Sequence, residues 1–199
     1  MKLLKNTTLI IFILAISAIS KAQTTDISHA TIICFEKNDK VVKKSVTVLQ
    51  EEVAKRTGIQ LPVSSKPNKS ANPVIYIGLE SQATLFPANI RQMLAGLPKT
   101  EAEGYKVVFS AESQTAAVTG SDARGVLYGV GKLLRSLKMN SGKIIVPDEL
   151  KLASSPKYPI RGHQLGYRPK TNAYDAWSPA QFDKYIRDLA VFGANSIEI

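Results

Sequence analysis

The side chains best suited to chemistry in this 199-residue chain lie after residue 158. Arg161 and His163 are two positions apart in an extended segment, and alternate residues of a β-strand point to the same side, so these two side chains would share a face. Trp177, with Tyr174 close by, offers aromatic rings that suit stacking against sugar rings. The alternative is that both rings pack against a neighbouring domain.

The same stretch contains four carboxyl groups, those of Asp175, Asp183, Asp188 and Glu198. Glycoside hydrolysis uses two carboxyl groups roughly 5 to 10 Å apart, or one together with help from the substrate. Asp183 and Asp188 lie off the apolar stripe of a predicted helix and are expected to be solvated. Asp175 falls in a predicted loop and Glu198 on a predicted strand, so the sequence assigns no catalytic pair.

These side chains need a scaffold, and the pattern around them predicts one β–α–β step. A strand over residues 160–166 is followed by a loop over 167–177, which also contains Tyr167 and Arg168, and a second strand occupies 195–199.

A helix with a clear beginning separates the two strands. Ser178 is its N-cap, Pro179 takes the first helical position, Gln181 completes a capping box, and Gly193 ends the helix. Parallel strands are stable only when neighbouring strands and helices cover them, so we expect this step to open a larger (β/α)₈ barrel or sheet that continues beyond residue 199.

Residues 23–154 predict a separate α/β domain. The predicted strands cover residues 31–35, 74–77, 105–110 and 115–119, and the predicted helices cover 41–57, a short stretch at 90–94, and the region after Asp122, an N-cap. Residues 125–132 depart from the strict pattern of a phosphate loop. They lie inside a predicted amphipathic helix, so Gly125 and Gly129 are expected to allow close packing of this helix on the sheet. Residues 151–158 are predicted to be a linker to the second unit, residues 155–199.

The first 22 residues have the three parts of a secretory signal. Lys2 and Lys5 precede an apolar stretch over residues 9–19, and small residues flank Lys21 before a cleavage site at Ala22. The alternative is a membrane anchor, but the apolar stretch is too short for a bilayer core of roughly 30 Å. We therefore expect an exported protein, periplasmic or extracellular, that has no membrane contact once the signal is removed.

Composition excludes several classes of protein. Signal removal takes three lysines and lowers the formal net charge from +10 to +7, and the remaining bases are scattered, so no nucleic-acid partner is expected. A single cysteine, Cys34, rules out an internal disulfide and is predicted to be a buried strand residue. Two histidines and one cysteine far apart give no metal site, and no cofactor is expected.

Two stretches together resemble a known family. Residues 103–108 (EGYKVV), 117–120 (AVTG) and 122–134 (DARGVLYGVGKLL) are similar to the small α/β domain that precedes the catalytic barrel in glycoside hydrolase family 20, the β-N-acetylhexosaminidases, and in α-glucuronidases. Residues 158–162 (YPIRG) resemble the Pro-x-Arg-Gly start of the first barrel strand in the same enzymes. The chain departs from family 20 after Gly162 and at Glu198, where that family tends to have His.

The resemblance implies roles for several residues. The arginine that matches Arg161 lies in the sugar pocket of family 20, where a planar guanidinium can hydrogen-bond two neighbouring hydroxyls. The alternative is an arginine that bridges the two units. The predicted substrate-binding residues are therefore Arg161, His163 and Trp177, and the alternative for His163 is a purely structural role. In the family, the acid/base pair comes from a later strand.

We therefore expect the N-terminal part of an exported glycoside hydrolase: an accessory α/β domain followed by the start of a catalytic TIM barrel, acting on a carbohydrate such as a hexosaminide or a glucuronide. The chain alone is expected to be inactive, and the accessory domain to be structural. The rival hypotheses are a non-catalytic exported glycan-binding module and a protein-docking module.

Overall fold

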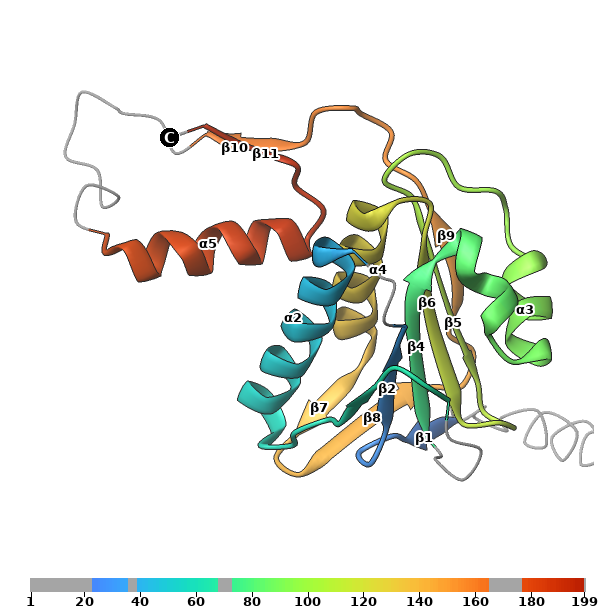
Figure 1. Cartoon of the computed structure of the whole chain (residues 1–199). Coiled ribbons are helices and arrows are strands. Elements are labelled where there is room, and N and C mark those ends of the chain that lie inside the picture. The colour runs from blue at the N-terminus through green and yellow to red at the C-terminus, as the bar shows by residue number, and fades with distance from the viewer. Residues whose placement is uncertain (1–22, 36–38, 68–72, 165–176, 199) are drawn as a thin grey trace, which may run out of the picture.

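The computed structural model describes residues 23–35, 39–67, 73–164 and 177–198 (Figure 1). The predicted signal at 1–22 and most of the predicted loop, including Tyr167, Arg168, Tyr174 and Asp175, lie outside the described residues. The elements are β1 (Thr24–Asp26), β2 (Thr31–Cys34), α2 (Lys40–Thr57), β3 (Val63–Ser64), β4 (Val74–Leu79), the 3₁₀ helix η1 (Glu80–Leu85), α3 (Ala88–Ala95), β5 (Tyr105–Ser110), β6 (Thr115–Gly120), α4 (Ala123–Ser136), β7 (Lys138–Asn140), β8 (Lys143–Pro147), β9 (Lys151–Ser154), β10 (Gly162–Gln164), α5 (Pro179–Val191) and β11 (Ser196–Glu198).

The first unit is an α/β sandwich around one mixed sheet, as predicted. The strand order is β3-β2-β4-β6-β5-β9, and the strands β3, β2, β4 and β6 are parallel to one another. The predicted hairpin β5–β6 is antiparallel, and so is the pairing of β5 with β9. Helices α2 and α4 cover one face of this sheet and α3 covers the other (Figure 1).

The strands of this sheet are apolar on both faces because both faces are covered. On β2, Ile32 belongs to the core under α2 and α4, whereas its neighbour Ile33 belongs to the smaller core under α3. On β5, Val107 and Phe109 face the first core and Val108 faces the second. The two-residue period of a strand therefore divides these residues between two cores.

The two long helices begin where the sequence predicts. Asp39 caps α2 by accepting a hydrogen bond of 2.9 Å from the backbone N–H of Val42, and Gly58 ends the helix with a φ of 76°, a conformation that suits glycine. Asp122 caps α4 through a 2.8 Å hydrogen bond from the backbone N–H of Gly125. Capping fixes where each helix enters the sandwich.

Residues 151–154 correct one prediction. They were expected to belong to a linker, but they form β9, whose Leu152 pairs with Val107 at the edge of the sheet. The sequence also did not reveal a small second sheet, in which β8 pairs with both β1 and β7. Ile144 and Val146 of β8 are fully buried there and extend the main core.

The second unit has the predicted β–α–β order. β10 and β11 are parallel, with His163 opposite Ile197, and Ser178 and Gln181 form the capping box of α5. Helix α5 lies between this two-stranded sheet and the ends of α2 and α4 (Figure 1). An Arg187–Glu51 ion pair joins α5 to α2.

Three glycines of α4 sit where other elements come closest. A Cβ atom on Gly125 would overlap the carbonyl oxygen of Gly104, and one on Gly129 would lie 2.6 Å from Cγ1 of Val118, which confirms the close packing predicted for both. A Cβ atom on Gly131 would overlap the carbonyl oxygen of Val191 in α5. The same helix therefore packs tightly on its own sheet and on the second unit.

Replacing Gly125 by Ala tests this packing. Alanine normally stabilises a helix relative to glycine by up to about 1 kcal/mol. Here the obstructing atom belongs to the backbone, so we expect Gly125→Ala to lower the free energy of unfolding by about 2 kcal/mol, as measured by chemical denaturation. Lys132→Ala, a change on the same helix away from the glycine contacts, is the control, with an expected effect below about 0.5 kcal/mol. A stabilising Gly125→Ala substitution would contradict the packing.

Candidate functional site

Glu103 lies in the loop before β5, at the junction of the two units. Its backbone has a φ of 60°, a conformation uncommon for a residue with a side chain. Its N–H donates a 2.7 Å hydrogen bond to Oδ2 of Asp122, whose other carboxylate oxygen caps α4. The next residue, Gly104, donates its own N–H to the carbonyl of Glu101 at 2.8 Å. The start of α4 therefore holds the Glu103 loop in place.

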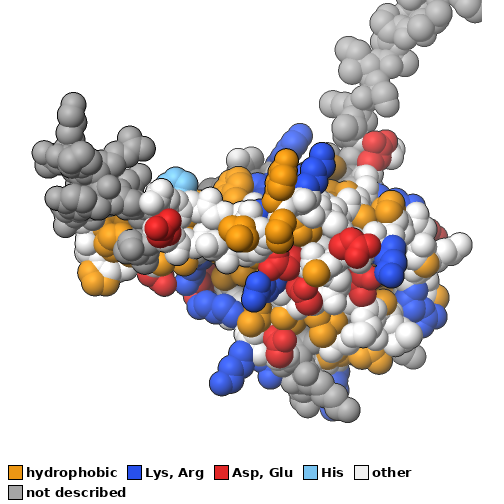
Figure 2. All heavy atoms as spheres, turned by 90° about the horizontal axis from the view of Figure 1, so that it is seen from above, with side chains coloured by type: hydrophobic (Ala, Val, Ile, Leu, Met, Phe, Trp, Pro, Cys, Tyr) orange, Lys and Arg blue, Asp and Glu red, His pale blue; other side chains and the backbone are white. Residues whose placement is uncertain are grey.

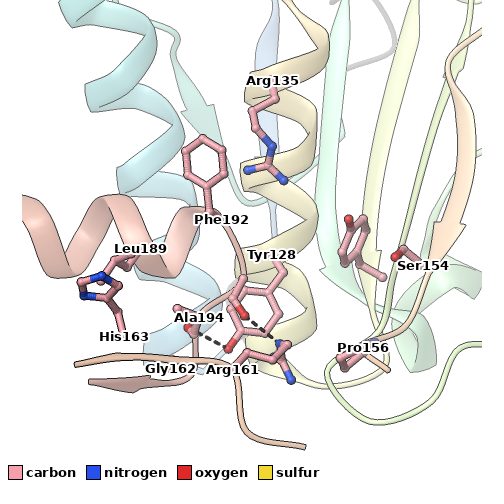
Figure 3. Close-up of a pocket in the computed structure, with 12 residues that line it drawn as sticks. Tyr128, Arg135, Ser154, Pro156, Arg161, Gly162, His163, Leu189, Phe192 and Ala194 are labelled. Atoms are coloured by element: carbon pink, nitrogen blue, oxygen red, sulfur yellow. Dashed lines mark hydrogen bonds between the residues drawn. The ribbon is translucent and has the colours of Figure 1, made fainter. Parts of the chain in front are cut away.

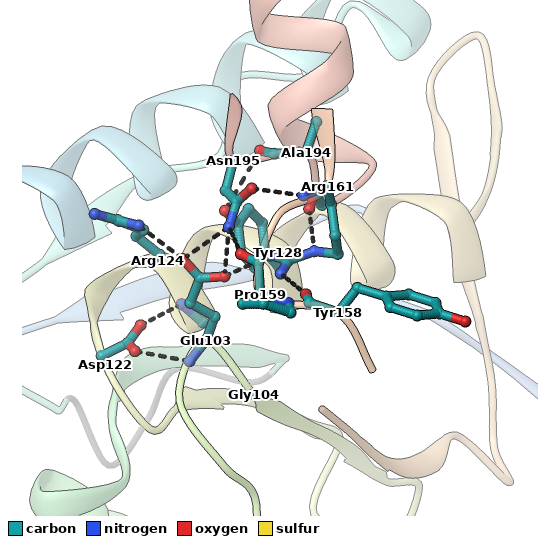
Figure 4. A network of polar contacts seen from close by, with 12 residues as sticks. Glu103, Gly104, Asp122, Arg124, Tyr128, Tyr158, Pro159, Arg161, Ala194 and Asn195 are labelled. Carbon is teal, nitrogen blue, oxygen red and sulfur yellow. Dashed lines mark hydrogen bonds and ion pairs between the residues drawn. The ribbon is translucent and has the colours of Figure 1, made fainter. Parts of the chain in front are cut away.

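The carboxylate of Glu103 is paired with groups from both units (Figure 4). Arg161 donates from Nη2 to Oε2 at 2.6 Å, Arg124 from Nη1 to Oε1 at 2.7 Å, and Asn195 from Nδ2 to Oε2 at 3.1 Å. Only 13% of the Glu103 side chain is exposed, against 65% for Arg124, so the contact with Arg161 (21% exposed) is the better shielded of the two ion pairs. We call these four residues the Glu103 cluster.

Arg161 is held from several directions. Its Nε donates to the carbonyl of Gly193 and its Nη1 to the carbonyl of Tyr158, both at 2.9 Å. The guanidinium carbon lies 5.4 Å from the ring centroid of Tyr128, which belongs to α4. Since Tyr158 and Gly193 belong to the second unit and Glu103 and Tyr128 to the first, Arg161 bridges the two.

Asn195 fixes the starts of β10 and β11 together. Its Oδ1 accepts from the N–H of Arg161 at 2.9 Å, its own N–H donates to the carbonyl of Arg161 at 2.9 Å, and its Nδ2 donates to the carbonyl of Pro159 at 2.8 Å. Both Arg161 and Asn195 come directly before their strands, so the Glu103 cluster lies at the N-terminal end of the parallel pair.

A cavity of about 400 Å³ separates the two units beside the cluster (Figure 3). Phe192, the C-cap residue of α5, packs on the guanidinium of Arg135, with 4.6 Å from Cζ to the ring centroid. Arg135 also donates to the carbonyl of Val191 at 2.6 Å. The hydroxyl of Tyr128 donates to the carbonyl of Ala194 at 3.4 Å. The lining includes aromatic and cationic side chains, and the polar groups of Arg135 and Tyr128 each have a partner within the chain.

Charged neighbours at the junction of the two units shift the pKa of one carboxyl group. Burial raises the pKa of Glu103, but hydrogen bonds from Arg161 and Arg124 outweigh it and hold the pKa below its ordinary value of 4.5. Glu103 is therefore ionised at neutral pH, which suits an ion pair and not a proton donor. Burial raises the pKa of Tyr128 above its ordinary value, with the negative charge of Glu103 contributing, so its hydroxyl stays protonated.

A family model described as glycosyl hydrolase family 20, domain 2 matches residues 17–152. The chain belongs to this family. No curated protein sequence matches the chain.

Solved glycoside hydrolases share the fold of the domain 2 unit at low sequence identity. A GH20 β-N-acetylhexosaminidase from Streptomyces coelicolor A3(2) is 18% identical, with a TM-score of 0.58 over 89% of this chain and 31% of that one. A GH20 exo-β-N-acetylglucosaminidase from Vibrio harveyi is 16% identical, with a TM-score of 0.56 over 87% and 22%. A GH115 4-O-methyl-α-glucuronidase with specificity for decorated arabinogalactans is 17% identical, with a TM-score of 0.61 over 87% and 25%. The chain thus spans at most about a third of these proteins.

The predicted substrate-binding residues lie on the second unit, beside domain 2. Arg161 bridges the two units, which is the alternative role that the sequence allowed for it. Nδ1 of His163 lies 3.1 Å from the hydroxyl oxygen of Tyr185 on α5. The Trp177 ring packs edge-on against the rings of Phe182 and Tyr185, with centroid distances of 5.4 and 5.2 Å. Contact of these three residues with a sugar stays a prediction.

The structure also identifies residues that sequence reasoning missed. Glu103 was noted only as part of the family-like stretch, and Asn195 only as the start of a strand. Among the described residues, no three potential ligands lie close enough to hold a metal ion, and no helix there is long and apolar enough to cross a membrane. Cys34 is buried, as predicted.

The lowered pKa of Glu103 predicts an acid-sensitive junction. A carboxyl group whose pKa is lower in the folded than in the unfolded chain contributes stability above its ordinary value of 4.5, and this contribution is lost as the pH falls through the folded pKa. We therefore expect Glu103→Gln to lower the free energy of unfolding at pH 7 and to flatten its fall between about pH 5 and pH 3.

Denaturant titrations at a series of pH values measure both effects. Hydrogen bonds from Ser28 also lower the pKa of Asp26, but this group is present in both proteins, so the difference between the two profiles isolates Glu103. Parallel profiles for the wild type and Glu103→Gln would contradict the assignment.

Proposed function

We propose that the full-length protein is an exported glycoside hydrolase that acts on O-glycosidic bonds, with domain 2 over residues 23–154 and the start of a catalytic (β/α)₈ barrel over 155–199. The observation that carries the proposal is the Glu103 cluster: it joins a family 20 domain 2 to the Pro-x-Arg-Gly segment directly before a parallel β–α–β step.

The structural comparisons support a barrel after domain 2. The family model ends at residue 152, whereas the likeness to the solved glycoside hydrolases covers 87 to 89% of the 199 residues and therefore extends beyond residue 152. A right-handed β–α–β step is the repeating unit of such a barrel. Those solved chains are three to four times longer, so most of a barrel would follow residue 199.

Domain 2 has a structural role in this proposal. It contacts the N-terminal end of β10 and β11 through the Glu103 cluster, and barrel active sites form at the opposite, C-terminal end. It also covers α5, through the close approach of Gly131 to Val191 and the Arg187–Glu51 pair. Domain 2 would therefore stabilise the first strands without touching the substrate.

The substrate class follows from the proteins that share the fold. Two of the three solved structures described above are β-N-acetylhexosaminidase-type enzymes and one is an α-glucuronidase. We therefore propose a hexosaminide or a uronide as substrate, with the catalytic acids on strands after residue 199. The signal-like residues 1–22 support export.

Assay of the full-length protein on chromogenic aryl glycosides, hexosaminides and uronides first, tests the proposal. We expect release of the aryl group from one of these classes, and none from the 199-residue chain alone, because one strand–helix–strand step lacks a full set of barrel loops. A full-length protein that hydrolyses no glycoside would contradict the proposal and favour a binding module.

A further inference from the structure

The two faces of the β10–β11 pair have different surroundings. His163 points from β10 toward α5, where its Nδ1 lies 3.1 Å from the hydroxyl of Tyr185 and the two ring centroids are 5.6 Å apart (Figure 3). Arg161, two residues earlier, packs against Tyr128 of domain 2. This face of β10 is therefore the one that α5 and domain 2 cover.

The register of the pair places other side chains on the opposite face. Gln164 is paired with Glu198, and Gly162 with Ser196. Because residues in register on neighbouring parallel strands point to the same side, and alternate residues point to opposite sides, Gln164 and Glu198 face away from α5. All four of these residues are exposed. Figure 2 shows the molecule from above, the side on which β10 and β11 lie in Figure 1.

In a (β/α)₈ barrel the helices surround the strands, so the face away from α5 is the barrel interior. Gln164 and Glu198 therefore lie side by side on the inner face, about 5 Å apart at the backbone. They lie further along the chain direction of the strands than Arg161, which directly precedes β10, and barrel enzymes bind substrate at the C-terminal side of the strands.

The chemistry of the pair fits a polyhydroxylated ligand. A carboxylate accepts hydrogen bonds from two hydroxyls, and a primary amide both donates and accepts, so together they match the mixed donors and acceptors of a sugar ring edge. Gly162 and Ser196 below them are small. A Cβ atom on Gly162 would lie 3.2 Å from Cβ of Ser196, so the two strands approach each other closely at this position.

We propose that Gln164 and Glu198 bind the hydroxyl groups of the sugar from the inner face of the barrel and contribute to substrate specificity. This inference rests on the proposed function, because it takes β10 and β11 to be the first two barrel strands. Glu198 acts here as a hydrogen-bond acceptor for hydroxyls, separate from the acid/base pair of the reaction.

Kinetics of the full-length enzyme on the aryl glycoside that it hydrolyses best test the pair. Glu198→Gln and Gln164→Ala should each lower kcat/KM by about 10- to 100-fold, the effect expected for lost hydrogen bonds that involve a charged or buried polar group. Asp183→Asn is the matched control, an exposed acid on the outer side of the same step, and should stay within about twofold of the wild type. Melting temperatures of all variants establish that each is folded.

A substrate lacking one ring hydroxyl at a time provides a second readout. For the hydroxyl that Glu198 binds, the deoxy substrate should be poor for the wild type but should lose little further activity with Glu198→Gln, because the same contact is removed twice. Should Glu198→Gln fail to fold, Gln164→Ala carries the same comparison.

Each outcome separates the two proposals. An active wild type whose Glu198→Gln and Gln164→Ala variants keep full kcat/KM overturns the assignment of the pair and leaves the glycoside hydrolase function standing. A wild type that hydrolyses no glycoside overturns both.

Discussion

A carboxylate with only 13% of its side chain exposed must be paired, and the pairing of Glu103 determines how the two units of this protein meet. Domain 2 alone supplies Arg124, which is largely exposed and is a weak partner. Arg161 and Asn195 of the second unit complete the shell around the carboxylate. Each of these also binds backbone carbonyls at the starts of β10 and β11, so satisfying one charge also fixes the position of two strands.

The sandwich behind this cluster gives it rigidity. Asp122 connects the Glu103 loop to the start of α4. The close packing of α4 depends on Gly125 and Gly129, where an added Cβ would collide with the Gly104 carbonyl and with the Val118 side chain. The same helix meets α5 at Gly131. A domain built in this way holds the N-terminal end of the strand pair, and in barrel enzymes the substrate binds at the opposite end of the strands.

Local signals in the sequence were enough to predict the long helices and four strands of the main sheet, β2, β4, β5 and β6. Asp122 and Ser178 cap helices at the expected positions because a cap depends on neighbouring residues alone. The strands β1, β7 and β9 are three to four residues long, and β1 reaches its partner β8 across more than a hundred residues, so no local pattern identifies them.

The candidate site was predictable only in part. A chemical argument singled out Arg161, but its partner Glu103 comes from a turn with no distinguishing spacing, 58 residues earlier. The sequence also placed Arg161 and His163 on one face without saying which face α5 covers. The contact of His163 with Tyr185 decides this, and such a contact follows from packing and not from spacing.

A double-mutant cycle on Glu103 and Arg161 tests most directly whether this ion pair joins the two units. Free energies of unfolding of the wild type, Glu103→Ala, Arg161→Ala and the double variant should give a coupling energy of about 1.5 to 3 kcal/mol, because the pair is charged, hydrogen-bonded and largely shielded from solvent. The parallel cycle on Glu103 and the exposed Arg124 should give less than about 1 kcal/mol. Additive effects of Glu103→Ala and Arg161→Ala, to within about 0.5 kcal/mol, would contradict the account.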